Sequence, residues 1–419
     1  MTAVTRPRAP RRRAWPRMLL SAGVAGLVAW WAGGLLSARG TESIVIRVGV
    51  LIDRPSVQIT ADGPVTVEDL SLSMFTPPVP AALPARTGWI VTASGTGGLD
   101  LSGVALGPAV RLTAQQGLLR ADGRPYRGVL ELRRTPGGQI TVVNEIDLES
   151  YLYGVIKGEV DPRWPPEAVR AQAVAARTLA VQRMLAARPA VPGASTGAGF
   201  DLPATTDAQV YLGAAAEDPA ATAAVDATRG LIVTYDSRPI FAAYHSNSGG
   251  HTEDSENVWG SLYPYLRGVP DPYALQAPGV TWSTMLPLAA IETDLRRGGF
   301  SFMVAGGGSA GTDLGALDDV APGRVTPWGR VVTVLLRGGD GRTQEVNANR
   351  FRLLVGASVL RSTMFSVTRQ GGAVDFTGRG SGHGVGLDQW GSRAMAARGF
   401  TFEQILKYYY TGVTIEPRY

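Results

Sequence analysis

One glutamate, Glu159, stands in a setting that favours proton-transfer chemistry. It lies in the segment 154–165, at the break between two expected helices, with Ile156, Val160 and Trp164 as apolar neighbours. An apolar environment disfavours the charged form of a carboxyl group and so raises its pKa. A glutamic acid that keeps its proton near neutral pH can act as a general acid. Glu159 is therefore the candidate catalytic residue.

The residues alone leave alternatives open. Lys157 and Arg163 would lower the pKa of Glu159 if their charges pointed at it, and Glu159 could also be an ordinary exposed carboxylate at a helix end. Trp164 is equally ambiguous, because a tryptophan can be a stacking platform for a sugar or a residue of the core. Sequence spacing does not decide between these interpretations.

All three histidines of the chain lie in two short segments rich in glycine and serine. His245 and His251 bound the segment His-Ser-Asn-Ser-Gly-Gly-His, and His383 follows Gly-Arg-Gly-Ser-Gly. Scarce polar side chains in such loops indicate a cleft, although each histidine could instead hydrogen-bond its own loop. A zinc site is only weakly indicated, because His245 and His251 are six residues apart on a loop. We expect no metal site.

Other chemistries find little support. The chain has no cysteine, which removes thiol nucleophiles, cysteine zinc sites and disulfides. The Gly-x-Gly-x-x-Gly pattern at residues 306–311 lacks a clear following helix, and no Gly-x-Ser-x-Gly surrounds Ser246 or Ser248. We therefore expect neither a nucleotide cofactor nor a serine hydrolase, and no cofactor of another kind is indicated. The glycines that alternate over residues 378–386 would allow close approach to a ligand or a neighbouring strand.

The positive charge of the chain is concentrated at its N-terminus. The net charge is +5, but residues 1–40 contain seven arginines and no acidic residue, which leaves the remainder at about −2. Nucleic acid is therefore not an expected partner. Met18–Leu36 carries no charge and as a helix would span about 28 Å, close to the thickness of a bilayer core.

This charge pattern predicts a single-pass membrane anchor. Residues 1–17 form a basic cytoplasmic tail, Met18–Leu36 crosses the membrane, and the rest of the chain lies outside the cell membrane by the positive-inside rule. A cleaved signal peptide, which would give a secreted protein, is the competing interpretation.

The remaining sequence predicts an α+β fold. Residues 41–144 contain short β-branched or alternating runs separated by turn residues and are expected to be rich in strands. Residues 145–419 form the expected catalytic part, in which the spacing becomes helical at Asp147 and residues 281–377 again look mixed α and β. We expect helices near residues 147–158, 166–188, 219–228, 389–398 and 402–410, and a hairpin over 231–244 that turns at Asp236-Ser237.

Several long motifs, in order, resemble the stage II sporulation protein D family, also called the amidase-enhancer family. They are Asn144-Glu145-Ile146 leading to Glu159, residues 164–168 with 171–177, His245 to Gly250 with Trp259, and Gly378 to Gly391 with Tyr408 to Gly412. The resemblance covers most of residues 43–419. Ser381, Leu179 and Lys407 depart from residues common in the family, tryptophan, tyrosine and histidine respectively.

The resemblance implies a lytic transglycosylase that cleaves peptidoglycan glycan strands, preferably without stem peptides. It places the catalytic acid and base on Glu159, with the sugar's own 6-hydroxyl as nucleophile and a 1,6-anhydro end as product. The residues then expected around the glycan are Trp164, His245, Ser246, Ser248, His383 and Gln389. Two alternatives remain: a non-catalytic activator of a cell-wall amidase, and an inert wall-binding module.

Overall fold

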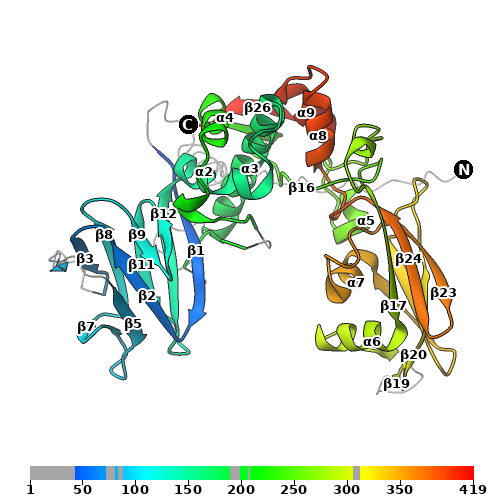
Figure 1. The fold of residues 1–419 in the computed structure, drawn as a ribbon, viewed down its shortest axis with the longest axis horizontal. Helices are drawn as coiled ribbons and strands as arrows, with labels where there is room; N and C mark the ends of the chain where they lie inside the picture. Colours follow the sequence, from blue (N-terminus) through cyan, green and yellow to red (C-terminus); the bar gives the residue numbers. More distant parts are fainter. Residues whose placement is uncertain (1–42, 72–80, 84–87, 189–198, 206–207, 305–311) are drawn as a thin grey trace, which may run out of the picture. The chain divides into compact units, whose positions relative to one another are not determined.

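The computed structural model describes residues 43–71, 81–83, 88–188, 199–205, 208–304 and 312–419. It has the predicted α+β class, with strands before residue 148 and mixed helices and strands after it (Figure 1). By its contacts, the chain from Ser43 to Pro417 forms one unit. The predicted membrane anchor, Met18–Leu36, lies outside the described residues. No helix within the described ranges is long and apolar enough to cross a bilayer.

The larger sheet of the β-rich part contains seven strands. Their order across the sheet is β13 (Leu202–Pro203), β1 (Val45–Arg54), β12 (Ile140–Asp147), β11 (Val129–Arg134), β8 (Ala109–Ala114), β3 (Val65–Asp69) and β4 (Ala81–Leu83). Only β13 pairs in parallel, with β1. Apolar residues alternate along the strands: Leu130 and Leu132 of β11 face Leu112 and Val110 of β8, and all four are fully buried. A one-residue slip would expose this row, so burial fixes the register.

A second, six-stranded sheet is antiparallel throughout. Its order is β10 (Arg124–Tyr126), β9 (Leu119–Ala121), β2 (Ser56–Ala61), β5 (Trp89–Ala93), β6 (Leu99–Leu101) and β7 (Val104–Leu106). Val57 and Ile59 of β2 pair with Val91 and Trp89 of β5, and these side chains are buried. Both sheets therefore follow the two-residue period expected of half-buried strands.

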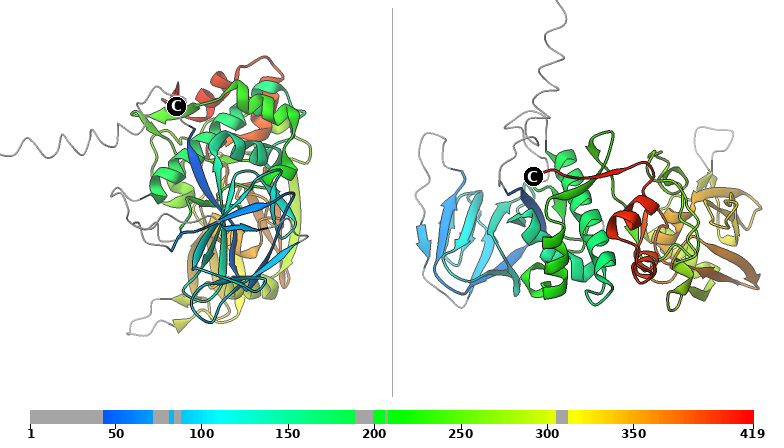
Figure 2. Two further views of the ribbon diagram at one scale, coloured as in Figure 1. Left: turned by 90° about the vertical axis from the view of Figure 1, so that its left-hand side faces the viewer. Right: turned by 90° about the horizontal axis from the view of Figure 1, so that it is seen from above.

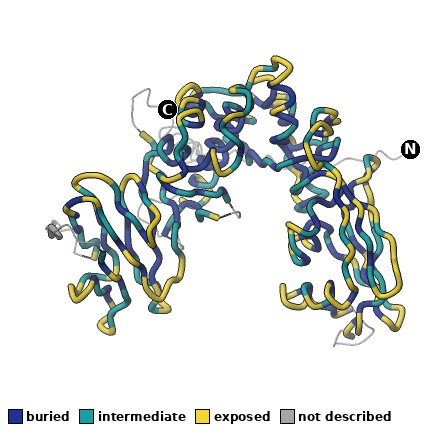
Figure 3. The backbone as a smooth tube through the Cα atoms, viewed as in Figure 1, coloured by how far each residue is buried: buried dark blue, intermediate teal, exposed yellow. Residues whose placement is uncertain are grey.

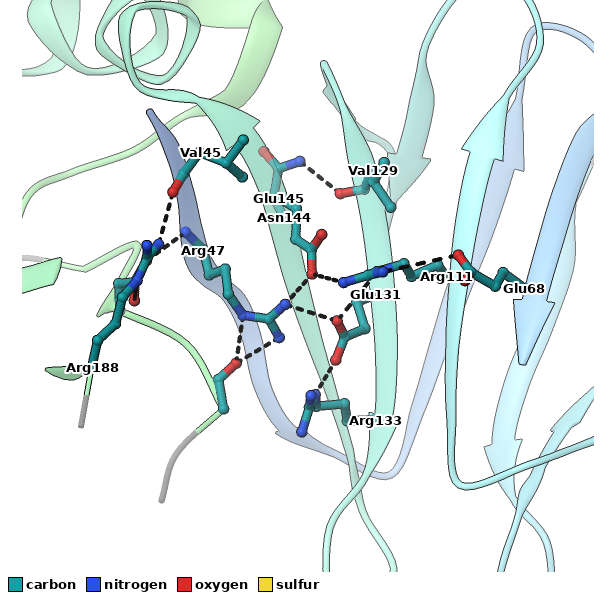
Figure 4. Close-up of polar contacts among 12 residues, drawn as sticks. Val45, Arg47, Glu68, Arg111, Val129, Glu131, Arg133, Asn144, Glu145 and Arg188 are labelled. Atoms are coloured by element: carbon teal, nitrogen blue, oxygen red, sulfur yellow. Dashed lines mark hydrogen bonds and ion pairs between the residues drawn. The ribbon is translucent and has the colours of Figure 1, made fainter. Parts of the chain in front are cut away.

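A charged network crosses the larger sheet (Figure 4). Glu131 is fully buried on β11, and Nη1 of Arg47 lies 3.0 Å from its Oε2, with Arg133 as a second ion-pair partner. Glu145 of β12 pairs with Arg47 and, at 3.0 Å, with Arg111. Burial opposes ionisation of Glu131, but the hydrogen bond and charge of Arg47 prevail and lower its pKa. A buried carboxylate is tolerated here because it is paired.

The expected helices form close to their predicted bounds. They are α2 (Leu148–Glu159), α3 (Pro166–Ala187), α4 (Pro219–Ala227), α8 (Gln389–Ala396) and α9 (Phe402–Tyr409). The side chain of Asp147 accepts a hydrogen bond from the N–H of Ser150 and caps α2, whereas α3 begins with Pro166, whose missing N–H costs nothing in the first turn. Both views of Figure 2 show α2, α3 and α4 (green) gathered together.

Alanine-rich α3 is buried along most of its length (Figure 3). Its side chains share a core with residues of β14 (Leu231–Tyr235), β25 (Leu387–Asp388), α8 and α9. The Arg177 guanidinium of α3 donates at 2.8 and 2.7 Å to both oxygens of Glu149 in α2, and both side chains are at most 1% exposed. This bidentate pair ties α3 to α2, and removal of either member would leave a buried charge without its partner.

The hairpin predicted for residues 231–244 turns where expected. Thr234 and Tyr235 of β14 pair with Pro239 and Arg238 of β15 (Arg238–Pro239), and Asp236 and Ser237 both have positive φ. Positive φ at both central positions is the geometry of a tight hairpin turn. On its other side β14 pairs with β26 (Thr414–Pro417), near the end of the described chain.

Residues 281–379 build their own core. Its elements are β17 (Thr281–Pro287), α6 (Leu288–Arg297), β18 (Met303–Val304), β19 (Thr312–Asp313), β20 (Leu317–Pro322), β21 (Thr333–Gly338), β22 (Thr343–Asn347), α7 (Ala348–Val355), β23 (Phe365–Gln370) and β24 (Ala373–Arg379). Ile291, Leu295, Phe351 and Phe376 are buried at its centre. The chain between β15 and β17 holds three short elements, β16 (Tyr244–His245), α5 (Ser255–Trp259) and the 3-10 turn η2 (Ala274–Gln276). Val258 of α5 belongs to the core around α3.

Candidate active site

Glu159 is the last residue of α2 and is half-buried. The backbone N–H of Val210 donates a hydrogen bond of 3.3 Å to its Oε1. The segment that carries Val210 is fastened to α2, because the N–H of Leu212 donates to the carbonyl of Gly154 at 3.1 Å. Glu159 therefore has a backbone donor from a segment that lies fifty-one residues further along the chain.

Two glycines of α2 make this approach possible. A Cβ at Gly154 would lie 2.6 Å from the ring of Tyr211, and one at Gly158 would lie 3.3 Å from the carbonyl oxygen of Val210. Glycine lowers the stability of a helix interior, so its presence here reflects the need for close contact. The two glycines lower the helix propensity of α2, and their lack of a side chain lets the segment 210–213 pack beside Glu159.

Burial raises the pKa of Glu159. Hydrogen bonds from the N–H of Val210 and from the side chains of Tyr244 and Gln389 lower it in part, and the net shift remains upward. The two cations that the sequence places nearby are engaged elsewhere: Nζ of Lys157 lies 4.0 Å from Asp218, and Arg163 pairs with Asp161 at 2.7 Å. Neither cation is therefore an ion-pair partner of Glu159, and burial remains the largest influence on its pKa.

A chain of buried polar groups orients Tyr244 toward Glu159. Tyr151 donates at 3.1 Å to Oε1 of Gln209, and Nε2 of Gln209 donates at 3.2 Å to the hydroxyl oxygen of Tyr244. Because that oxygen already accepts a hydrogen bond, its own proton is free to be donated to Glu159. Burial raises the pKa of Tyr244 well above its usual range, so the hydroxyl stays protonated.

Gln389 reaches Glu159 from the first residue of α8. The parallel pairing of β16 with β25 sets His245 beside Asp388 and brings Tyr244 and Gln389 to the same site. Nε2 of Gln389 also lies 3.5 Å from Oε1 of Gln172 on α3. A two-residue ladder therefore assembles the polar surroundings of Glu159 from distant parts of the sequence.

A pair of buried carboxyl groups lies beneath this ladder. Asp388 caps α8 by accepting the N–H of Gly391 at 2.8 Å, and it also accepts the N–H of Ser248 at 2.6 Å. Asp271 accepts the hydroxyls of Ser248 at 3.0 Å and Tyr409 at 3.1 Å. Burial, with the charge of Asp271 beside it, raises the pKa of Asp388 well above its usual range. Through these hydrogen bonds the pair holds α8 to the 245–250 loop.

Two tryptophan rings contact each other at a tilt, and one of them, Trp164, follows Glu159 by five residues in the chain. The ring centroids of Trp164 and Trp390 are 4.9 Å apart, and both residues are half-buried. The guanidinium carbon of Arg393 lies 5.2 Å from the ring centroid of Trp390 and 6.0 Å from that of Trp164. Trp164 thus belongs to an aromatic group that is partly open to solvent, which leaves a sugar-contact role available to it.

Four residues remain of those predicted to contact the glycan, and two of them, Ser246 and His383, are partly exposed. Ser246 is half-buried and its carbonyl accepts the N–H of Trp390 at 3.2 Å, so it lies beside the tryptophans. His383 is half-buried between His245 and Trp259, with ring centroids 5.4 and 5.1 Å away. Burial, with the nearby charges of two arginines, lowers the pKa of His383 to about 3, so it is neutral at physiological pH.

His245 and Ser248 lie below the surface. His245 is 5% exposed, its Nδ1–H donates to the carbonyl of Val385 at 3.1 Å, and burial lowers its pKa far below the usual range. Ser248 is fully buried with its hydroxyl on Asp271. Their predicted contacts with a glycan stay predictions, and the geometry itself gives both residues a part in holding the loop that carries Tyr244.

A zinc site would need several ligating side chains close together. Among the described residues, no three His, Asp or Glu side chains are grouped so as to hold a metal ion. His251 instead stacks on Trp328, with ring centroids 4.2 Å apart, and its Nδ1–H donates to the carbonyl of Thr252 at 2.7 Å.

Sequence reasoning did not find Val210, Tyr244, Gln209, Trp390 or the Asp271–Asp388 pair. Tyr244 and Trp390 adjoin predicted site residues in the chain, and this adjacency was the available signal. Nothing in the sequence marked the amide of Val210, because a backbone donor carries no residue type. Pairing of two-residue strands is likewise invisible to periodicity.

Comparison with known proteins groups these segments with one family. The family profile described as Stage II sporulation protein matches residues 136–235, which include α2, Glu159 and α3. Stage II sporulation protein D of Bacillus subtilis (strain 168) is 33% identical over 284 residues, which cover 65% of this chain and 75% of that protein. This chain belongs to the stage II sporulation protein D family. The resemblance inferred from its motifs is confirmed.

Two further proteins are similar to this member of the stage II sporulation protein D family. An uncharacterized protein of Brachyspira hyodysenteriae is 34% identical over 274 residues, which cover 65% of this chain and 68% of that protein. The amidase enhancer of Bacillus subtilis (strain 168) is 31% identical over 301 residues, 63% of this chain but 40% of that protein.

Proposed function

We propose that this protein acts on the bacterial cell wall as a lytic transglycosylase. Its substrate is a peptidoglycan glycan strand, preferably without stem peptides, and its product carries a 1,6-anhydro-N-acetylmuramic acid end. The observation that carries the proposal is the half-buried carboxyl of Glu159, whose pKa is raised by burial and which Tyr244, Gln389 and the N–H of Val210 surround. Membership of the family, and the name amidase enhancer of one relative, support a role at the cell wall.

The geometry suits one carboxyl group that works in both directions. Protonated Glu159 donates its proton to the oxygen that links two sugar rings as that bond breaks. The carboxylate so formed then takes the proton of the sugar's own 6-hydroxyl as this oxygen bonds to the anomeric carbon. Proton and charge balance without a second carboxylate or an added water. Hydrogen bonds from Tyr244 and Val210 stabilise the carboxylate stage, which exists only after the first transfer.

The protein would act outside the membrane, tethered by the uncharged segment Met18–Leu36 behind its arginine-rich tail. This location fits the substrate, because glycan strands lie beyond the cell membrane. Accessibility of an introduced cysteine tests it. With no native cysteine in the chain, Ser43→Cys should react with a membrane-impermeant maleimide in intact cells, and labelling only after lysis would contradict an external domain.

A product assay tests the proposed activity. The full chain is incubated with peptide-free glycan strands, and the ends formed are identified by mass spectrometry. Wild type should yield anhydro ends, Glu159→Gln none, and Glu403→Gln as much as wild type, because Glu403 is an exposed glutamate in the first turn of α9. Absence of anhydro ends from wild type would overturn the proposal.

A second function is favoured by one comparison, the similarity to an amidase enhancer. The protein would then bind a cell-wall amidase, or the glycan, and stimulate the amidase without cutting the strand itself. Glu159→Gln separates the two: full stimulation by this variant, with no anhydro ends from wild type, would establish the activator role in place of the enzyme.

A further inference from the structure

Trp164, Trp390 and Arg393 lie in mutual contact, and we call this group the Trp–Arg cluster. The tryptophan rings contact each other and the guanidinium of Arg393 lies over both. Trp164 follows Glu159 by five residues, and Trp390 follows Gln389, whose side chain hydrogen-bonds the carboxyl of Glu159. Arg393 lies one helical turn beyond Trp390 on α8, on the same face. The cluster therefore adjoins the proposed catalytic site.

Arg393 is an exposed cation without an ion-pair partner within 4.0 Å among the described residues. Asp161 is the acidic group whose pKa its charge helps to lower, but Asp161 is taken by Arg163 through contacts of 2.9, 3.1 and 2.7 Å. Those hydrogen bonds are the main cause that lowers the pKa of Asp161 to about 2. A guanidinium that lies over aromatic rings keeps the N–H groups of its rim available to a further acceptor.

A muramic acid residue presents such an acceptor only in one form. Its lactyl carboxyl is an uncharged amide while a stem peptide is attached and a free carboxylate once the peptide has been removed. An arginine fork matches a carboxylate with two parallel hydrogen bonds, whereas an amide offers one neutral oxygen. Flat tryptophan rings beside it can pack against the apolar face of a sugar.

Building on the proposed function, we propose that Arg393 binds the lactyl carboxylate of a peptide-free N-acetylmuramic acid residue while Trp164 and Trp390 contact its ring. The Trp–Arg cluster then makes the site next to Glu159 selective for glycan without stem peptides. Arg393 does not touch the bond that is cleaved and acts in substrate selection.

We expect Arg393 to make a moderate contribution to the affinity for strands that carry the lactyl carboxylate. A charge-assisted hydrogen bond at a partly exposed site changes affinity by about tenfold, and added salt weakens it. Removal of Arg393 should therefore lower affinity for carboxylate-bearing strands and leave affinity for uncharged strands nearly unchanged.

Binding in an inactive background tests the assignment without cleavage. The full chain carrying Glu159→Gln is titrated calorimetrically with peptide-free strands, and with the same strands whose lactyl carboxylates have been converted to methylamides by a carbodiimide. Free-acid strands should bind about tenfold more tightly at low salt. Adding Arg393→Gln should abolish the difference, and Arg393→Lys should restore part of it.

Arg398 provides the matched control. It is exposed, and its guanidinium carbon lies 4.9 Å from the ring centroid of Tyr273, so it is a second arginine stacked on an aromatic ring. Arg398→Gln should keep the tenfold preference. Equal binding of both strands, or a preference that survives Arg393→Gln, would overturn the role of Arg393 and leave the transglycosylase proposal standing. Failure of the Glu159→Gln background to bind either strand would overturn both.

Discussion

The hydroxyl of Tyr211 donates a hydrogen bond of 2.8 Å to Oδ1 of Asn144. Asn144 is fully buried on β12, and its amide donates to the carbonyl of Val129 on the neighbouring strand β11 (Figure 4) and to that of Arg127, which lies between β10 and β11. Tyr211 adjoins Val210, whose N–H contacts Glu159. The β-rich part therefore holds in place the backbone donor of the candidate catalytic residue.

Removal of the Tyr211 hydroxyl tests this link. Tyr211→Phe should lower the free energy of unfolding by about 1 to 3 kcal/mol, because Oδ1 of Asn144 would lose a partner in a buried site. Urea denaturation measures the change. Tyr153→Phe is the control: its hydroxyl donates at 2.6 Å to the exposed Asp226, so its loss should cost about 0.5 kcal/mol or less. An equal decrease in the free energy of unfolding for both variants would show that the buried hydrogen bond of Tyr211 stabilises the protein no more than the exposed one of Tyr153.

The hydroxyl of Tyr244 should set the pH range of activity. It hydrogen-bonds Glu159 and lowers the pKa of that carboxyl, so Tyr244→Phe should raise this pKa further. A general acid acts while protonated, and the alkaline limb of the pH profile of kcat/KM should therefore move to higher pH. The overall rate should fall as well, since the carboxylate stage loses a donor. An alkaline limb that stays in place, or moves to lower pH, would contradict the assigned contact.

Glu159 should make the folded protein less stable as pH rises. Its pKa is raised in the fold above the value of about 4.3 in an unfolded chain, so the folded state binds the proton more tightly. Stability is then greatest below the unfolded pKa and is lost as pH rises through the folded pKa. Glu159→Gln, which cannot ionise, should raise Tm at pH 7 and change it little at pH 4. Calorimetry at both values checks this, and a variant less stable than wild type at pH 7 would refute it.

At Gly154 the lack of room for a side chain should affect stability more than helix propensity does. Alanine favours a helix by about 1 kcal/mol over glycine, but its Cβ at this position would lie 2.6 Å from the ring of Tyr211 and 2.9 Å from the carbonyl oxygen of Gly213. Gly154→Ala should therefore destabilise the protein by about 1 to 3 kcal/mol in chemical denaturation. Gly372→Ala, where a Cβ would meet no atom within 4 Å, is the control and should be close to neutral.

Local signals in the sequence were sufficient for much of the fold. Pro166 and Glu167 mark the start of α3, and Asp236-Ser237 marks the hairpin turn, because these residue types act through their own backbone conformation. The alternating glycines after residue 378 were expected to allow close approach to a ligand or a strand. They admit the neighbouring chain: a Cβ at Gly380 would lie 2.7 Å from the carbonyl oxygen of Asn247, and one at Gly382 would lie 2.8 Å from Cβ of His245.

The site was predictable only in part, because its parts meet through tertiary contacts. Glu159 could be singled out by its position between helices, but its partners Val210, Tyr244 and Gln389 come from segments far along the chain. Burial could not be predicted from the sequence either. Ser248 is a small polar residue in a glycine-bearing loop, a setting typical of exposed positions, but it is fully buried with its hydroxyl on Asp271. Local pattern identifies residue types, and packing decides which of them face a ligand.

The source of the oxygen at the new sugar end tests the central claim most directly. Wild-type protein is incubated with peptide-free glycan strands in water enriched in oxygen-18, and the ends are analysed by mass spectrometry beside those from Glu159→Gln. The account predicts ends lighter by one water than hydrolysed ends, free of the label, and formed only when Glu159 is present. Labelled reducing ends from wild type, or anhydro ends from Glu159→Gln, would contradict it.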